Sequence, residues 1–185
     1  MRRLRALLLV AVALLAPAAG AASKLDGVDL PQLYGFLIAN HLGSLGSNVR
    51  WPEGAIPAGA PFRVGVFGRD PFGKMLEQFF SGKKLKGRPL AIVRSGDPAA
   101  LAGCQMVFAD RPAPAALRSL VAGLAGKPIL TIVFSPDAAT EGAMIGLWLM
   151  SDGSLRFTLD VERLRQAQLA PSPGLLQLAL RAPPP

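Results

Sequence analysis

The chain has 185 residues, with 20 Lys and Arg against 12 Asp and Glu, and with 51% hydrophobic residues. This length suits one domain with one hydrophobic core, and the single cysteine, Cys104, excludes an intramolecular disulfide. The basic balance is compatible with a nucleic acid, an anionic membrane or an acidic protein partner. The sequence has no aromatic-plus-basic motif of the kind that binds nucleic acid, so we expect no nucleic-acid partner.

The N-terminal segment has the three parts of a secretory signal peptide. Three arginines lie within the first five residues, Ala6 to Ala16 is an uninterrupted apolar run, and Ala19-Gly20-Ala21 offers small residues for cleavage. A retained membrane anchor is the alternative, but the run is too short to cross a hydrocarbon core of about 30 Å comfortably. We therefore expect residues 1–22 to be a cleaved signal peptide.

Cleavage there sets the domain organisation and the compartment. The three arginines leave with the signal peptide, so 17 basic residues face 12 acidic ones in the mature chain. We expect one α/β domain over residues 23–180 and a disordered, proline-ended tail over 181–185. We also expect a periplasmic protein that does not itself span the membrane.

The first predicted element of the domain is a helix that starts at Leu30. Asp29 is a suitable N-cap and Pro31 suits the first turn, and apolar residues recur at helical spacing as far as Leu45. Glycines 43 and 46 are expected to end this helix.

A repeating pattern of strands and helices begins at Phe62. The apolar stretch Phe62 to Phe67 predicts a strand, and Asp70-Pro71 predicts the start of a helix that runs to Phe80. A basic loop, Gly82 to Gly87, follows. The next predicted strands are Pro89 to Val93, Cys104 to Ala109 and Ile129 to Phe134. The helices between them are one turn from Asp97-Pro98 to Gly103 and a longer helix over Ala113 to Leu124.

The C-terminal part of the pattern differs. Ala143 to Met150 and Leu155 to Leu159 are two predicted strands around Asp152-Gly153, which is typical of an antiparallel hairpin. Val161 to Gln168 and Pro173 to Leu180 are predicted helices. Alternating strands and helices with apolar strands favour a single α/β domain, mainly a parallel sheet with helices on both faces and an antiparallel C-terminal hairpin.

Candidate catalytic and cofactor groups are few. A Ser/His/Asp or Cys/His arrangement would need His41, which lies in the first helix and is more typical of a structural residue. The scattered acidic residues favour helix caps over a metal site, and the glycines after the first strand do not form a nucleotide-binding motif. We therefore expect a protein that is not an enzyme and has no cofactor or metal.

Cys104 is expected to be a buried, inert thiol; a redox-sensitive or dimer-linking thiol is the alternative.

Two surface segments are candidates for binding a partner. The densest basic run contains Lys83, Lys84, Lys86 and Arg88, which is either a solvated turn or a docking patch for an acidic protein face or a phospholipid headgroup. The C-terminal segment contains Leu175, Leu176 and Leu178, which either anchor a partner or pack onto the core of the domain.

The order of several short motifs resembles the YfiR family of periplasmic regulatory proteins. In chain order, the motifs are Tyr34-Gly35-Phe36, Trp51-Pro52, Phe62 to Phe72, Lys86 to Pro89, Cys104 to Phe108, Ile129 to Thr131, Glu141 to Ile145, Leu155 to Asp160, Gln168-Leu169 and, at the end, Gly174 to Ala179. Cys104 matches a cysteine of the family, whereas the other family cysteines are absent. The disulfide-based redox control implied for some members is therefore not expected here.

The resemblance implies a regulatory role. Relatives of this kind bind the periplasmic sensor region of an inner-membrane diguanylate cyclase and hold it inactive, which lowers cyclic di-GMP and biofilm formation. The resemblance also implies a homodimer. A periplasmic small-molecule-binding module is the alternative, because the carboxyl ends of parallel strands form crevices. Loops at Gly68-Arg69-Asp70 and Arg94-Ser95-Gly96 would line such a crevice.

Overall fold

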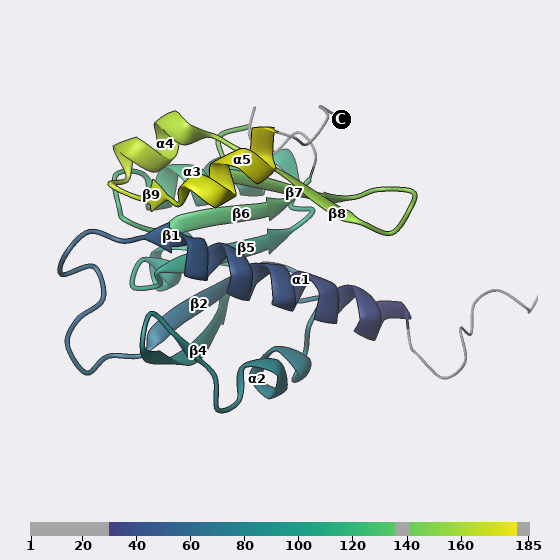
Figure 1. Cartoon of the computed structure of the whole chain (residues 1–185), viewed down its shortest axis with the longest axis horizontal. Helices are drawn as coiled ribbons and strands as arrows, with labels where there is room; N and C mark the ends of the chain where they lie inside the picture. The colour runs from purple at the N-terminus through teal and green to yellow at the C-terminus, as the bar shows by residue number, and fades with distance from the viewer. Residues whose placement is uncertain (1–29, 136–140, 181–185) are drawn as a thin grey trace, which may run out of the picture.

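A computed structural model describes residues 30–135 and 141–180 of the chain (Figure 1). The proposed signal peptide, the Asp29 cap and the tail lie outside these residues. The elements in chain order are α1 (Leu30–Asn48), β1 (Val49–Arg50), β2 (Phe62–Phe67), α2 (Met75–Phe80), β3 (Lys84–Leu85), β4 (Arg88–Ser95), the 3₁₀ turn η1 (Pro98–Leu101), β5 (Met106–Asp110), α3 (Pro114–Leu124), β6 (Leu130–Phe134), β7 (Ile145–Leu149), β8 (Leu155–Leu159), α4 (Val161–Gln166), β9 (Ala170–Pro171) and α5 (Pro173–Leu180).

Seven strands form one sheet in the order β3-β4-β2-β5-β6-β7-β8. The five strands from β4 to β7 run parallel, and β8 pairs with β7 as an antiparallel edge. The predicted α/β class, the mainly parallel sheet and the C-terminal hairpin are all confirmed. Strands β5 and β6 are buried along their whole length, as expected for the centre of a sheet that is covered on both faces.

Helices cover both faces of this sheet. One face packs against α1, α2, α4 and α5 in the larger apolar cluster, and Figure 1 shows α1 and α5 lying side by side across it. The opposite face packs against η1 and α3 in a second cluster that contains Cys104. Alternate residues of each strand enter the two clusters, so Val66 and Phe108 face α1 and α2 whereas Val107 faces α3.

The first helix is longer than the sequence predicts. It continues through Gly43 and Gly46 to Asn48, so the expectation that these glycines end the helix is wrong. A Cβ atom at Gly46 would lie 2.7 Å from a methyl carbon of Leu85. This glycine therefore admits the close approach of β3 to the helix rather than terminating it.

The region after β2 also differs from the prediction. Helix α2 begins at Met75 rather than at Pro71, because the Asp70 carboxylate accepts a hydrogen bond from the Phe72 amide and closes a local turn.

The expected basic loop contains strand β3, which pairs with the start of β4. The turn between them places Lys86 at φ 52° and Gly87 at φ 75°, the positive values that a tight two-residue hairpin requires.

A second, two-stranded sheet was not foreseen. Strand β1 pairs antiparallel with β9, with Val49 opposite Pro171. Each of these strands has only two residues, which is too short to show an alternation of apolar and polar residues. Sequence periodicity therefore cannot detect them. This pair joins the end of α1 to the start of α5 and fixes the two helices beside each other.

Within the described ranges, none of the helices combines the length and the hydropathy needed to cross a membrane.

Candidate functional site

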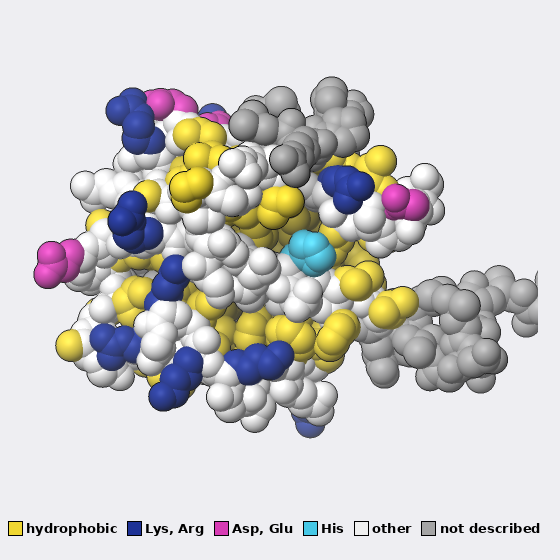
Figure 2. All heavy atoms as spheres, viewed as in Figure 1, with side chains coloured by type: hydrophobic (Ala, Val, Ile, Leu, Met, Phe, Trp, Pro, Cys, Tyr) yellow, Lys and Arg dark blue, Asp and Glu magenta, His cyan; other side chains and the backbone are white. Residues whose placement is uncertain are grey.

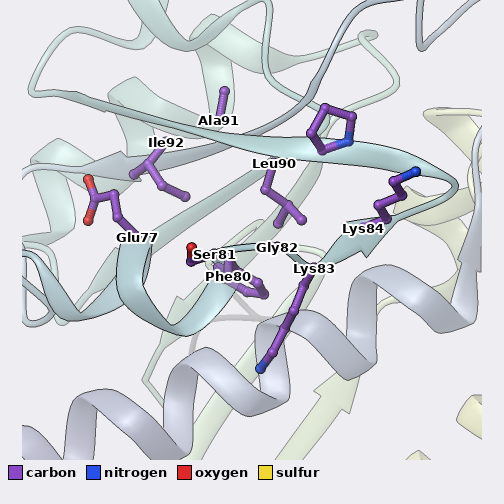
Figure 3. Close-up of a pocket in the computed structure, with 10 residues that line it drawn as sticks. Glu77, Phe80, Ser81, Gly82, Lys83, Lys84, Leu90, Ala91 and Ile92 are labelled. Atoms are coloured by element: carbon purple, nitrogen blue, oxygen red, sulfur yellow. The ribbon is translucent and has the colours of Figure 1, made fainter.

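A groove of about 480 Å³ follows β4 between this strand and the end of α2. Beyond its short pairing with β3, β4 has a strand partner on only one side in the described part of the chain. The other side presents backbone groups that can accept a further strand. Figure 3 shows Leu90 and Ile92 pointing from β4 into the groove, with Glu77 at one end and Lys84 at the other.

The four basic residues of the candidate patch do not share one role. Lys83 and Lys84 are exposed and line the groove, and the Lys83 ammonium lies 3.4 Å from the centre of the Phe79 ring. Arg88 is half-buried at the start of β4. Figure 2 shows Lys and Arg side chains gathered over the part of this face formed by β3, β4 and α2. Lys83 and Lys84 are therefore the two residues of the patch that line the groove, but the Lys83 side chain turns away from it toward α1 and the Phe79 ring (Figure 3).

Lys86 is tied back to the protein. Its ammonium donates a hydrogen bond of 2.7 Å to the carbonyl of Ser47, near the C-terminus of α1, and lies 5.9 Å from the centre of the Trp51 ring. Burial lowers the pKa of the Lys86 ammonium. Because a cation at a helix C-terminus satisfies unpaired carbonyls, Lys86 attaches the hairpin to α1.

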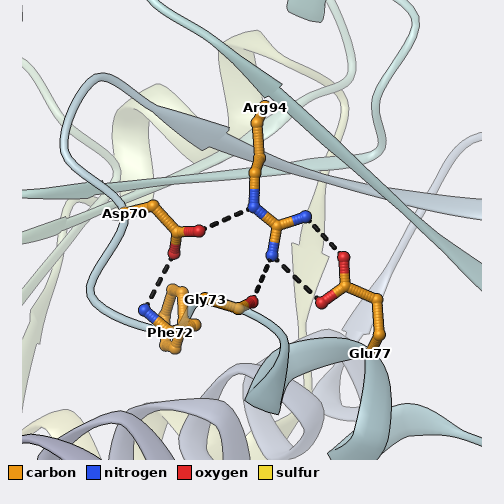
Figure 4. A network of polar contacts seen from close by, with 5 residues as sticks. All are labelled: Asp70, Phe72, Gly73, Glu77 and Arg94. Carbon is orange, nitrogen blue, oxygen red and sulfur yellow. Dashed lines mark hydrogen bonds and ion pairs between the residues drawn. The ribbon is translucent and has the colours of Figure 1, made fainter.

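Arg94 closes the other end of the groove through a network with α2 and the turn before it (Figure 4). Its guanidinium forms ion pairs with Asp70 at 2.6 Å and Glu77 at 2.5 Å and donates to the Gly73 carbonyl. Hydrogen bonding from Arg94 lowers the pKa of Glu77 and, in return, the bond to Glu77 raises the pKa of Arg94. All three guanidinium nitrogens are engaged, so Arg94 holds β4 against α2.

The C-terminal leucines are separated by the fold. Leu175 is buried in the core, Leu176 is half-buried, and the side chain of Leu178 is 59% exposed. A crevice of about 430 Å³ between α1 and α5 is lined by Leu175, Leu178 and His41. His41 uses one ring nitrogen within its own helix, 2.9 Å from the Leu37 carbonyl. Of the three leucines, Leu178 is the one that exposes most of its apolar surface.

A comparison with protein families shows the family to which the chain belongs. The YfiR/HmsC-like family matches residues 39–180, which span every element from the middle of α1 to the end of α5. The chain belongs to the YfiR/HmsC-like family. A search of curated proteins gave no match to it. Proteins of this family are periplasmic and regulatory rather than catalytic, and membership suggests a regulator of a diguanylate cyclase.

The side chains of His41 and Cys104 have separate surroundings in this YfiR/HmsC-like chain. Within residues 30–135 and 141–180, no group of three or more His, Cys, Asp or Glu residues could hold a metal ion. Cys104 is buried, as predicted, and burial raises the pKa of its thiol. His41 and Cys104 belong to opposite faces of the sheet, since the thiol packs with α3 and the imidazole lies on α1. They form no catalytic pair.

A polar cluster lies at the carboxyl ends of β2 and β5, where the sequence predicted a role for Arg69 but not for Asp110 or Tyr34. The side chain of Asp110 is fully buried and pairs with Arg69, and it accepts a hydrogen bond of 2.8 Å from the Tyr34 hydroxyl. Burial first, and then the bond to Asp110, raise the pKa of Tyr34, so the phenol remains a donor at neutral pH. Charged residues that directly follow two apolar strands are the signal that predicts this cluster, because parallel strands end at the same edge.

Proposed function

We propose that this protein is exported to the periplasm and binds the periplasmic sensor region of an inner-membrane diguanylate cyclase, which it holds inactive. The consequence is less cyclic di-GMP and less biofilm. The observation that carries the proposal is the match of residues 39–180 to the YfiR/HmsC-like family.

Repression of this kind requires binding that depends on the conformation of the cyclase. A binding protein shifts an equilibrium only by the difference between its affinities for the two states. We propose that the protein binds the inactive arrangement of the sensor region more tightly than the active one. A hundredfold preference corresponds to about 2.7 kcal/mol, which a small docking surface can supply.

The groove along β4 is the docking surface that we propose. Its open strand edge suits an extended segment, which would add backbone hydrogen bonds. Leu90 and Ile92 supply an apolar floor, and Lys84 supplies positive charge at one end, with Lys83 beside it on the side that faces α1. The occupant that fits these features is an extended acidic segment of the cyclase sensor region. Leu178 on α5 is a second, separate apolar contact candidate.

The decisive test is made in the organism that carries the gene. Deletion is expected to raise cyclic di-GMP, and the rise should disappear when the partner cyclase is also deleted. The double variant Lys83→Glu, Lys84→Glu should partly reproduce the deletion. Arg118→Glu is the matched control, because Arg118 is exposed on α3 at the opposite face of the sheet. Unchanged cyclic di-GMP in the deletion strain, with the cyclase expressed, rules out the proposed role.

The homodimer that the resemblance implies is also a proposal. Light scattering of the purified mature protein measures its mass directly. A monomeric mass at micromolar concentration would remove the dimer from the proposal without affecting the role in cyclase repression.

A further inference from the structure

A second site is suggested by the topology of the sheet. Strand β2 lies between β4 and β5, and the chain leaves β2 toward α2 on one face but leaves β5 toward α3 on the other face. The two connections therefore diverge from neighbouring strand ends. In open α/β sheets, ligands bind in the crevice that such a divergence creates.

Charged residues occupy both strand ends at this point. The pairing of β2 with β5 ends with Phe67 opposite Ala109, so Gly68-Arg69 on one chain segment lies next to Asp110-Arg111 on the other. Arg69 is paired with the fully buried Asp110, yet 62% of its side chain is exposed. A buried carboxylate thus fixes the position of a guanidinium that remains open to solvent.

Arg111 is held beside it by two aromatic rings. Its guanidinium carbon lies 4.7 Å from the centre of the Phe134 ring and 5.4 Å from that of Tyr34, and the two rings meet edge to face at 5.2 Å. The Arg111 backbone has φ 44°, a conformation that non-glycine residues seldom adopt. Among the described residues, Arg111 has no carboxylate partner.

The described residues do not balance the local charge. Arg69 and Arg111 both act electrostatically on the Tyr34 phenol, and Asp110 supplies one negative charge against these two cations. The neighbouring Asp70 is already engaged by Arg94 and the Phe72 amide. Among the described residues, one positive charge therefore remains uncompensated at this edge of the sheet.

We infer that this edge of the sheet, where the two connections diverge, binds a small soluble molecule through a carboxylate or phosphate group, with Arg69 and Arg111 as the two ligating side chains. Guanidinium groups match the paired oxygens of such anions. Stacking on Tyr34 and Phe134 fixes the plane of Arg111, which reduces the side-chain entropy lost on binding. This site is separate from the groove along β4 and does not rest on the proposed docking there.

Calorimetric titration of the mature full-length protein tests the inference. Inorganic phosphate and succinate are the two probes, and each is compared with sodium chloride at the same ionic strength. Saturable binding of at least one probe is expected, and the probe that binds distinguishes a phosphate ligand from a carboxylate ligand. Arg111→Gln should weaken binding about tenfold or more. Arg118→Gln, on α3, is the matched control and should bind like the wild type.

A second variant separates loss of the site from loss of the fold. Arg111→Lys keeps the positive charge but lacks the planar fork, so it should bind more weakly than the wild type and more tightly than Arg111→Gln. Circular dichroism checks that each variant is folded. The inference is overturned if neither probe binds beyond the chloride reference, or if Arg111→Gln and Arg111→Lys both bind like the wild type.

Discussion

The hydroxyl of Tyr34 donates a 2.8 Å hydrogen bond to the carboxylate of Asp110, which lies 76 residues further along the chain. Tyr34 lies on α1 and Asp110 ends β5, so this bond attaches the first helix to the centre of the sheet. The Asp110 side chain is fully buried, and a buried carboxylate is stable only when its oxygens are paired. The hydroxyl therefore contributes to the position of α1 and satisfies one oxygen of the buried carboxylate.

Tyr34→Phe isolates this contribution. The ring contact with Phe134 is retained in the variant, whereas one oxygen of Asp110 loses its donor. We expect a loss of about 1–2 kcal/mol in the free energy of unfolding, measured by urea denaturation at neutral pH. Asp152→Asn, in the exposed turn of the β7–β8 hairpin, is the comparison and should be less destabilised. Equal stability of Tyr34→Phe and the wild type would show that the bond is dispensable.

Arg94→Gln is expected to lower stability in a pH-dependent way. Hydrogen bonding from Arg94 lowers the folded-state pKa of Glu77. This pair therefore stabilises the fold above the unfolded-state pKa of Glu, about 4.3, and the contribution is lost as the pH falls through the lower folded value. Glu77 is 48% exposed, so solvent limits its share to less than about 1 kcal/mol.

Urea unfolding of Arg94→Gln and the wild type at pH 7 and near pH 3 measures this dependence. The difference between the two proteins should shrink at the lower pH. A difference of the same size at both pH values would mean that Arg94 acts through the Gly73 carbonyl rather than through the carboxylates of Glu77 and Asp70. Arg165→Gln is the control, because Arg165 pairs with Glu162 on the exposed surface of α4.

The sequence predicted the parallel sheet because its strands are long and apolar. Strand β2 begins and ends at the predicted residues, Phe62 and Phe67, and β6 differs by one residue at its start. Strands of two residues, such as β1 and β3, contain too few residues for an alternating pattern to be read. Gly46 was misjudged for a different reason: the requirement for glycine came from Leu85, 39 residues away, and not from the local chain.

The candidate site was predicted in part. The run of lysines and the C-terminal leucines are visible in the sequence, but their separate environments are not. Nothing local indicates that Lys86 contacts Ser47 or that Leu175 is buried while Leu178 is exposed. These differences depend on how α1 lies against β3 and α5, which is a property of the tertiary fold.

Cys104→Ser should be destabilised but functional. The thiol is buried among apolar residues of η1, α3 and the sheet, and burial raises its pKa. A hydroxyl placed there should lower the free energy of unfolding by about 1–2 kcal/mol, whereas Cys104→Ala should lose less because it stays apolar. Slow thiol labelling of the native protein is expected at neutral pH. Rapid labelling, or a disulfide-linked dimer on a non-reducing gel, would contradict the assignment of an inert thiol.

Export is expected to remove the first 21 or 22 residues. The small residues at Ala19 and Ala21 suit the cleavage site of signal peptidase, so the mature chain should begin at Ala22 or Ser23. Mass spectrometry of the protein in a periplasmic extract measures this terminus. An intact Met1 on a membrane-bound protein would show that the segment is retained as an anchor.

Lys84 and Lys86 are two residues apart and should respond differently to the same substitution. Lys86→Met removes the contact with the Ser47 carbonyl at the end of α1, so it should lower the free energy of unfolding by about 0.5–1 kcal/mol. Lys84 is exposed at the groove, so Lys84→Met should leave stability unchanged and weaken binding to the periplasmic region of the cyclase. Because that binding is partly electrostatic, the defect of Lys84→Met should be larger at low salt than at high salt. Thermal unfolding of both variants, together with binding measured at two salt concentrations, separates the two roles. If Lys86→Met is the variant that loses binding while keeping full stability, the assignment of Lys86 to the fold and Lys84 to docking is reversed.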